Sequence, residues 1–361
     1  MTMADREHDR ERAAAFLQRM TDIMNGGALA LMCSLGHRTG LFDAMATLDG
    51  PATAADIAGA AGAHERHVRE WLAAMVTGGV VEHDADHGTY LLPPEHAGLV
   101  TRGAGPLNLT SYCQYVALLG QVEDEVVAAF RSGGGVSYRS YPRFHALMAE
   151  TSGQRLDALL LSGVVPLLAD GHQRLSAGLD VADVGCGSGR ALIILAGAYP
   201  ASRFTGYDIA TDALAAARAE AEAAGLDNVT FVERDAARLD EVERFDLVAT
   251  FDALHDQPRP DAVLAGIHDA LRPGGTYLCV EPLASSQLEE NVHLPTGPFL
   301  YTMSTMHCMM VSLAEGGEGL GAAWGEQEAA ARIAAAGLAD VAVHQLRGDR
   351  SNHYLVATRP A

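Results

Sequence analysis

The sequence predicts an α/β fold, in which a Rossmann-like, doubly wound and mostly parallel sheet follows a mainly helical winged-helix domain. From residue 179 onward, short apolar strands alternate with alanine-rich helices, a pattern typical of parallel strands joined by crossover helices. A glycine-rich loop, VADVGCGSGRA, contains the end of the first of these strands. Earlier in the chain, residues 51–98 contain two short helical segments and a two-stranded wing.

Charge and composition exclude several classes of function. The chain has 361 residues, a formal net charge of −21 and no lysine. An acidic surface repels phosphate backbones, and the absence of lysine removes a phosphate-binding or Schiff-base lysine. The first residues are charged where a secretory signal would be apolar, and no apolar run approaches the ~20 residues that span a bilayer. We therefore expect a cytoplasmic protein that binds neither nucleic acid nor membrane.

The cysteines show no pattern that would predict a metal or disulfide site. They are scattered without a CxxC pair, which favours reduced cytosolic thiols over a zinc knuckle or a disulfide framework. The five are Cys33, Cys113, Cys186, Cys279 and Cys308.

We expect three regions along the chain. Residues 1–104 form an N-terminal helical and winged-helix domain, and residues 105–175 form a helical connector that covers the substrate. Residues 176–361 form the Rossmann-like domain, with an insert at 284–328. The glycine-rich part of that insert, AEGGEGLGAAWG, is either a lid or a plain loop.

The winged helix has two possible roles. DNA binding is disfavoured because its second helix, AHERHVREWLAAMVTGGVV, mixes acidic with basic residues and its wing is acidic. The same helix has a broad apolar face that includes Val68, Trp71 and Leu72. We therefore expect a dimerisation module, and the chain to be a homodimer through its N-terminal domain.

The glycine-rich loop predicts a ligand site. Gly185, Gly187 and Gly189 lie between a strand and a helix, where glycine lets the backbone approach a ligand closely. A dinucleotide fingerprint has the spacing G-x-G-x-x-G, whereas here Arg190 takes the place of the third glycine. Asp183 precedes the loop, where it suits the ammonium of a methionine moiety better than a pyrophosphate.

The next strands add a nucleoside clamp. Asp208 ends the second strand and can accept hydrogen bonds from both ribose hydroxyls, while Ile209 covers the adenine. Asp235, after the third strand, can accept from the adenine amino group, and the Ala236 N–H can reach a ring nitrogen. Phe251, at the end of the fourth strand, completes the candidate cofactor set. Either aspartate alone could instead be a helix cap.

The motifs DVGCGSGR, YDIA, RDAARL and ALRPGGTYLCVEP resemble those of class I S-adenosylmethionine-dependent methyltransferases over residues 179–283. The resemblance implies S-adenosyl-L-methionine as cofactor. The winged helix and LHDQPRPDAVLAGIHDALRPGG are similar to small-molecule O-methyltransferases, although Gln257 replaces their usual tryptophan. The stretch from 288 to 329 looks more like bacterial winged-helix methyltransferases. Together these resemblances imply methyl transfer to a small-molecule acceptor.

Methyl transfer to a hydroxyl needs a base, and histidine suits this role at neutral pH. His255 follows the fourth strand and matches the catalytic histidine of the O-methyltransferase pattern, with Asp256 beside it in the candidate catalytic set. The alternative is a histidine at a helix start. His307, in the methionine-rich segment YTMSTMHCMM, is either a substrate or base residue or ordinary helix core. The spacing of His293, His307 and Cys308 fits no familiar zinc pattern, so no metal site is predicted.

Three other functions stay open at this point. One is N- or C-methylation, with His255 only orienting the acceptor. Another is a protein that binds S-adenosylmethionine as a regulator, or that catalyses a rearrangement without methyl transfer. The last is a nicotinamide-dependent oxidoreductase on a similar sheet. The glycine spacing and Asp183 count against the last of these.

Overall fold

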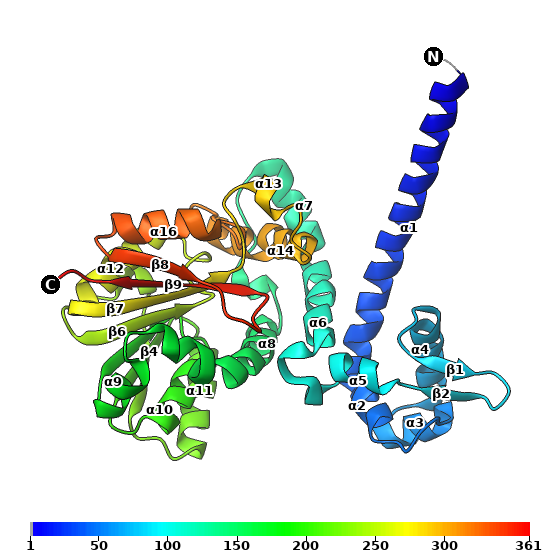
Figure 1. Cartoon of the computed structure of the whole chain (residues 1–361), viewed down its shortest axis with the longest axis horizontal. Helices are drawn as coiled ribbons and strands as arrows, with labels where there is room; N and C mark the ends of the chain where they lie inside the picture. The colour runs from blue at the N-terminus through cyan, green and yellow to red at the C-terminus, as the bar shows by residue number, and fades with distance from the viewer. Residues whose placement is uncertain (1–2) are drawn as a thin grey trace. The chain divides into compact units, whose positions relative to one another are not determined.

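A computed structural model describes residues 3–361, with side chains described from residue 9 onward (Figure 1). The chain forms two compact units, one up to Gly120 and the other from Gln121. We describe each unit by itself. In the described part of the chain, no helix combines the length and apolar character needed to cross a membrane.

The first unit is helical with a small wing. Its helices are α1 (Met3–Thr39), α2 (Leu41–Ala46), α3 (Ala54–Ala61), α4 (Glu65–Thr77), α5 (Pro94–Val100) and α6 (Leu109–Leu119). The wing pairs β1 (Glu82–Asp84) with β2 (Thr89–Leu91) in antiparallel register. Thr53 and Asp56 form a reciprocal capping box at the start of α3, which fixes where that helix begins. The predicted helix-turn-helix and wing are therefore present.

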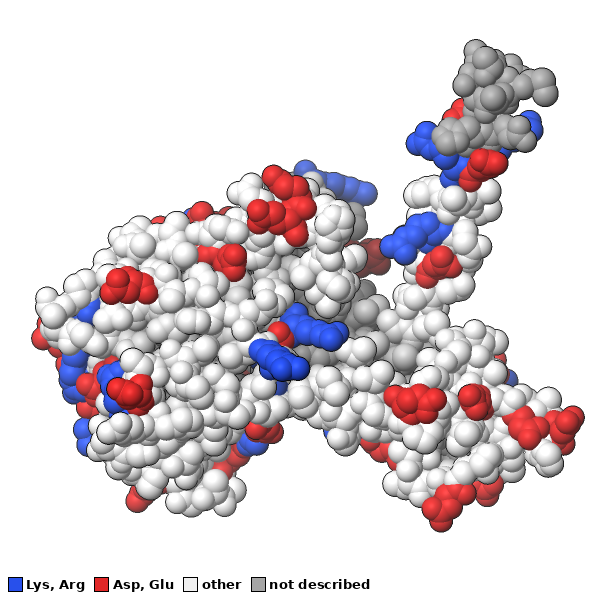
Figure 2. Space-filling model, in the orientation of Figure 1, with Lys and Arg blue, Asp and Glu red and all other residues white. Residues whose placement is uncertain are grey.

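The buried face of α4 forms the core of this unit. Val68, Trp71, Leu72 and Met75 are all buried against α2 and α3. By contrast, β1 is exposed along its length. Figure 2 shows acidic side chains spread over the visible face of this unit, which does not favour a phosphate backbone as partner.

The second unit is built on a seven-stranded sheet with the order β5-β4-β3-β6-β7-β9-β8. The strands are β3 (Asp180–Val184), β4 (Arg203–Asp208), β5 (Val229–Glu233), β6 (Phe245–Phe251), β7 (Leu271–Pro282), β8 (Ala339–His344) and β9 (Asn352–Thr358). The first five run parallel, and β9 is antiparallel to both of its neighbours. The sequence prediction of a mostly parallel sheet is confirmed.

Helices cover both faces of this sheet (Figure 1). One layer contains α9 (Gly171–Ala177), α10 (Arg190–Ala198) and α11 (Thr211–Ala223), and the other contains α12 (Pro260–Ala270) and α16 (Gly325–Ala335). The chain reverses its winding between β3 and β6, so the carboxyl ends of these two strands border the crevice in which such folds bind ligands.

The remaining helices of the second unit lie in the connector and the insert. The connector contains α7 (Glu123–Ser132), the 3₁₀ turn η3 (Tyr138–Ser140), α8 (Phe144–Leu159) and a π-helical turn, η4 (Leu160–Val164). The insert contains α13 (Leu288–Asn291), α14 (Gly297–Met303), a second π-helical turn, η7 (Ser304–Cys308), and α15 (Met309–Ala314). π-helical turns inside helices often occur at functional sites.

Candidate functional site

The glycine-rich loop connects β3 to α10. Gly185, Gly187 and Gly189 have φ angles of 78°, 52° and 72°, which favour glycine. An added Cβ at Gly185 would lie 2.6 Å from the Cβ of Ala253, whereas at Gly187 it would meet no described atom within 4 Å. The loop is therefore tightly packed at its start and open at Gly187.

Asp183 lies buried at the end of β3. Its Oδ1 has no hydrogen-bond partner in the described part of the chain. Burial, and secondarily the nearby Asp208 carboxylate, raises the pKa of Asp183 to about 8. A buried carboxyl without a partner is costly unless a ligand supplies one, and a cationic group would stabilise its ionised form.

Asp208 sits at the end of β4 beside the loop. Its Oδ2 accepts from the Gly187 N–H at 2.7 Å, and its Oδ1 accepts from the Ala210 N–H at 2.8 Å. Because a carboxylate has roughly four acceptor positions, both oxygens can still accept from further donors. The next side chain, Ile209, is 71% exposed, as an apolar side chain that covers a ligand would be before the ligand binds.

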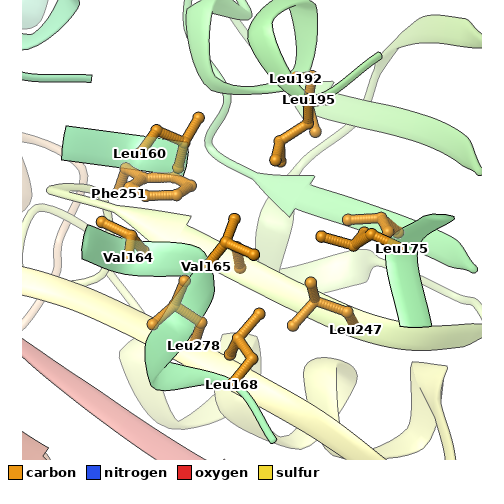
Figure 3. A pocket seen from close by; sticks show the side chains of 12 residues that line it. Leu160, Val164, Val165, Leu168, Leu175, Leu192, Leu195, Leu247, Phe251 and Leu278 are labelled. Atoms are coloured by element: carbon orange, nitrogen blue, oxygen red, sulfur yellow. The ribbon is translucent and has the colours of Figure 1, made fainter. Parts of the chain in front are cut away.

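The other three predicted cofactor residues have visible structural roles. Asp235 caps the 3₁₀ turn η6 (Ala236–Arg238) by accepting from the Ala237 N–H at 2.9 Å, and Ala236 is buried. Phe251 lines a small apolar cavity of about 20 Å³ between the sheet and the connector, together with Leu160 and Val164 (Figure 3). Cofactor contact by these three residues stays a prediction.

His255 is buried in the turn after β6 and is held by a carboxylate. Its Nδ1 lies 2.5 Å from Oε2 of Glu281, a fully buried residue of β7. Glu281 also accepts from the indole N–H of Trp324 and the backbone N–H of Leu254, each at 3.1 Å. Burial lowers the pKa of His255, but the Glu281 and Asp256 carboxylates outweigh it and raise that pKa well above its usual value.

Asp256 and Cys308 complete the surroundings of His255. Nε2 of His255 lies 3.2 Å from Oδ1 of Asp256, but the contact lacks hydrogen-bond geometry. Cys308 is buried on η7, and one ligand atom from each of His255, Asp256 and Cys308 lies within 4.8 Å of the other two. No sequence spacing indicated this cluster, because η7 begins some fifty residues after the end of β6.

His307, the residue before Cys308, is fully buried among aromatic rings. Its ring stacks on Phe144 at a centroid distance of 3.6 Å and meets Tyr141 edge-on at 4.7 Å and Tyr138 at 5.2 Å. Neither ring nitrogen has a hydrogen-bond partner among the described residues. Burial lowers the pKa of His307 to about 4, so the ring is neutral at pH 7.

Sequence reasoning missed Glu281, His353 and Arg155. His353, in β9, faces Glu281 across the β7–β9 ladder and is buried with both nitrogens unpaired in the described part. Arg155 of α8 contacts Asp252, directly after β6, at 2.5 Å and also bonds Asn352. Glu281 lies in the quoted motif ALRPGGTYLCVEP, but only the three-dimensional structure reveals its contact with His255.

Unpaired buried polar atoms gather at one edge of the sheet. Among the described residues, those without a partner belong to Asp183, Asp256, His307 and His353. Asp183 is the last residue but one of β3, Asp256 lies in the turn after β6, and His353 opposes the carboxyl end of β7. Since native proteins rarely leave such atoms unpaired, this end of the sheet is the candidate ligand site.

Two family models match the chain. Residues 27–102 match a model described as an Rv2258c-like winged HTH domain, and residues 175–315 match a model described as a methyltransferase domain. The sequence predictions of a winged helix and a methyltransferase domain are thereby confirmed.

Curated relatives and solved structures agree with these matches. The ubiquinone biosynthesis O-methyltransferase of Ruegeria pomeroyi is 34% identical over 110 residues, which make up 30% of this chain and 43% of that protein. The chain thus spans less than half the length of this relative.

The structure of the mitomycin 7-O-methyltransferase is 19% identical, with a TM-score of 0.71 over 97% of this chain and 99% of that one. PigF with S-adenosylhomocysteine is 22% identical, with a TM-score of 0.70 over 94% and 99%. At these identities the two structures establish the fold.

Proposed function

We propose that this chain, which joins a winged-helix domain to a class I S-adenosylmethionine-dependent methyltransferase domain, transfers a methyl group to a hydroxyl of a small molecule. The observation that carries the proposal is the buried His255–Glu281 pair at the carboxyl ends of β6 and β7. A histidine oriented by a carboxylate suits removal of a hydroxyl proton.

The residues at the edge of the sheet fit the cofactor. Asp183 would receive the ammonium of its methionine part, and the open surface at Gly187 would accommodate close approach. Asp208 would accept from the ribose hydroxyls, and Ile209 would cover the adenine. Asp235 and Ala236 would lie at the edge of the adenine ring. When bound, S-adenosylmethionine supplies a methyl carbon activated by its sulfonium. The protein must then align the acceptor with the cofactor, so that the acceptor oxygen lies about 3 Å from the methyl carbon.

His255 would take the proton of the acceptor hydroxyl on Nε2. Glu281 accepts from Nδ1–H, which in the neutral imidazole fixes the tautomer with its lone pair on Nε2. The same carboxylate stabilises the imidazolium that forms. Asp256, 3.2 Å from Nε2, adds to that stabilisation.

His307 would bind the acceptor instead of acting as a second base. A neutral imidazole both donates and accepts, so its two unpaired nitrogens match a hydroxyl or carbonyl group. The rings of Tyr138, Tyr141 and Phe144 around it favour the apolar part of an acceptor. His307 is fully buried, so an acceptor can reach its nitrogens only if side chains packed around it move.

We also infer a homodimer through α1. Phe16, Met20, Ile23 and Met24 are exposed and lie on one face of this helix at helical spacing. A contiguous exposed apolar stripe marks an association surface. A second copy of the same helix would cover it and would present the same stripe in return.

The first test measures cofactor binding and then transfer. Calorimetry should detect S-adenosylmethionine and S-adenosylhomocysteine but not NAD, with binding weakened at least tenfold in Asp208→Ala. Transfer is then measured with methyl-labelled S-adenosylmethionine on phenols, hydroxynaphthoates and hydroxy fatty acids. We expect His255→Ala to lower kcat by roughly 10²–10⁴ without changing cofactor affinity. A loss below tenfold would favour N- or C-methylation, and NAD binding would overturn the proposal.

A further inference from the structure

Three side chains with different ligand atoms converge beside the site. One atom each of His255, Asp256 and Cys308 lies within 4.8 Å of the others. His255 and Asp256 come from the turn after β6, and Cys308 comes from the π-helical turn η7. Nitrogen, oxygen and sulfur ligands from three residues are a set that zinc accepts, leaving a fourth position open.

One of these ligand atoms lacks a partner. Oδ1 of Asp256 is buried without a hydrogen bond in the described part of the chain, although Nε2 of His255 lies 3.2 Å away. In a tetrahedral site with metal–ligand distances near 2.0–2.3 Å, ligand atoms are separated by about 3.3–3.7 Å. The His255–Asp256 distance is already close to this range. The sulfur of Cys308 lies within 4.8 Å of the other two ligand atoms.

The surroundings orient His255 as metal-binding histidines are usually oriented. Glu281 accepts from Nδ1 at 2.5 Å and is itself held by Trp324 and the backbone of Leu254. A carboxylate on one ring nitrogen directs the other towards a metal and raises its basicity. The arrangement therefore includes outer contacts in addition to the three ligands.

We propose that His255, Asp256 and Cys308 bind a divalent transition-metal ion of the zinc class. On binding, the Cys308 thiol and the His255 imidazolium each lose one proton to solvent, the thiolate sulfur bonds the metal, and the neutral ring donates the lone pair of Nε2. Nothing is oxidised or reduced, and water fills the fourth position. A further consequence rests on the proposed function: a metal on Nε2 occupies the base, so it inhibits methyl transfer.

Cobalt(II) tests the site by a signal that does not depend on activity. Titration of the chelator-treated full chain should give tetrahedral visible bands and a near-ultraviolet thiolate-to-cobalt band, and one equivalent of zinc should remove both. Cys308→Ser should lose the thiolate band. Cys33→Ser, which changes a cysteine of the other unit, should keep it. Retained binding of S-adenosylhomocysteine shows that each variant is folded.

The outcomes separate the metal site from the proposed function. A wild-type chain without the thiolate band, or a band that persists in Cys308→Ser, overturns the site. A band together with no transfer to any hydroxyl acceptor supports the site and contradicts the proposed function. Where transfer occurs, one equivalent of zinc should lower its rate at least tenfold in the wild type and less than twofold in Cys308→Ser. Equal rates with and without zinc would overturn the inhibition.

Discussion

Asp183 is the residue whose ionisation should change when the cofactor binds. Its pKa, raised to about 8 by burial, leaves the carboxyl mostly protonated at pH 7 in the free chain. The ammonium of the cofactor would favour the carboxylate and lower that pKa again. Binding at pH 7 should therefore release most of a proton, about 0.9 at the limit.

Calorimetry in two buffers measures this proton. The observed enthalpy of S-adenosylhomocysteine binding should differ between phosphate and Tris, because the released proton ionises each buffer with a different enthalpy. In Asp183→Asn, which keeps the shape and loses the charge, the buffer dependence should vanish and the affinity should fall. Proton release that is unchanged in this variant would assign the release to another group.

Glu281 should set the pH dependence of transfer. Its carboxylate is a main cause of the raised pKa of His255, and the base works only when His255 is deprotonated. Glu281→Gln should therefore move the acid limb of the kcat–pH profile to lower pH. It should also lower the plateau roughly 10²–10⁴-fold, because the imidazolium loses its partner.

Trp324→Phe is the matched control for this change. It removes one donor to the same carboxylate but leaves the charge in place. The acid limb should stay close to its wild-type position. If Glu281→Gln leaves the limb where it was, His255 is not the group that titrates.

At the scale of elements, the segment between α7 and α8 is held to the insert by hydrogen bonds to the backbone carbonyls of the insert. The N–H of Val136 donates to the Met310 carbonyl at 3.1 Å, and the Tyr141 hydroxyl donates to the Met306 carbonyl at 2.5 Å. A Cβ on Gly135 would collide with the backbone at Met310 and Ala314, which cannot move independently of their helix. The aromatic rings around His307 therefore depend on a glycine at this position.

Gly135→Ala should destabilise the second unit by roughly 1–3 kcal/mol, as overpacking of a rigid contact does. Thermal unfolding, with cofactor binding as a second readout, measures the effect. Gly153→Ala in α8 is the control, because its Cβ would meet only Arg190 at 3.9 Å and alanine favours a helix by up to about 1 kcal/mol. Equal melting temperatures for both variants would contradict the packing argument.

The sequence was informative wherever a local pattern determines an element. Strand–helix alternation from residue 179 onward predicted a mostly parallel sheet, because buried parallel strands appear in the sequence as short apolar runs. The glycine loop, Asp208 and His255 were found because each lies at or shortly after the carboxyl end of a strand. The Glu281–His255 contact and the His255–Asp256–Cys308 cluster could not be found, since they depend on how distant segments pack. The π-helical turn that carries His307 and Cys308 has no sequence signal comparable to a cap or a turn.

For the whole molecule, the exposed stripe on α1 determines the expected oligomer. Met20 and Met24 lie near its centre and are 46% and 66% exposed. Replacing both by glutamate places four charges in a two-fold interface, where like charges and lost apolar contact oppose association. We expect the wild type to be a dimer and the double variant a monomer by light scattering.

The control adds the same charges to the opposite face of the same helix. Gln18→Glu with Asn25→Glu keeps the helix and the change in net charge, but leaves the apolar stripe intact. This variant should remain a dimer. If it dissociates as well, net charge and not the stripe controls assembly, and a dimer that survives Met20→Glu with Met24→Glu would show that α1 does not form the interface.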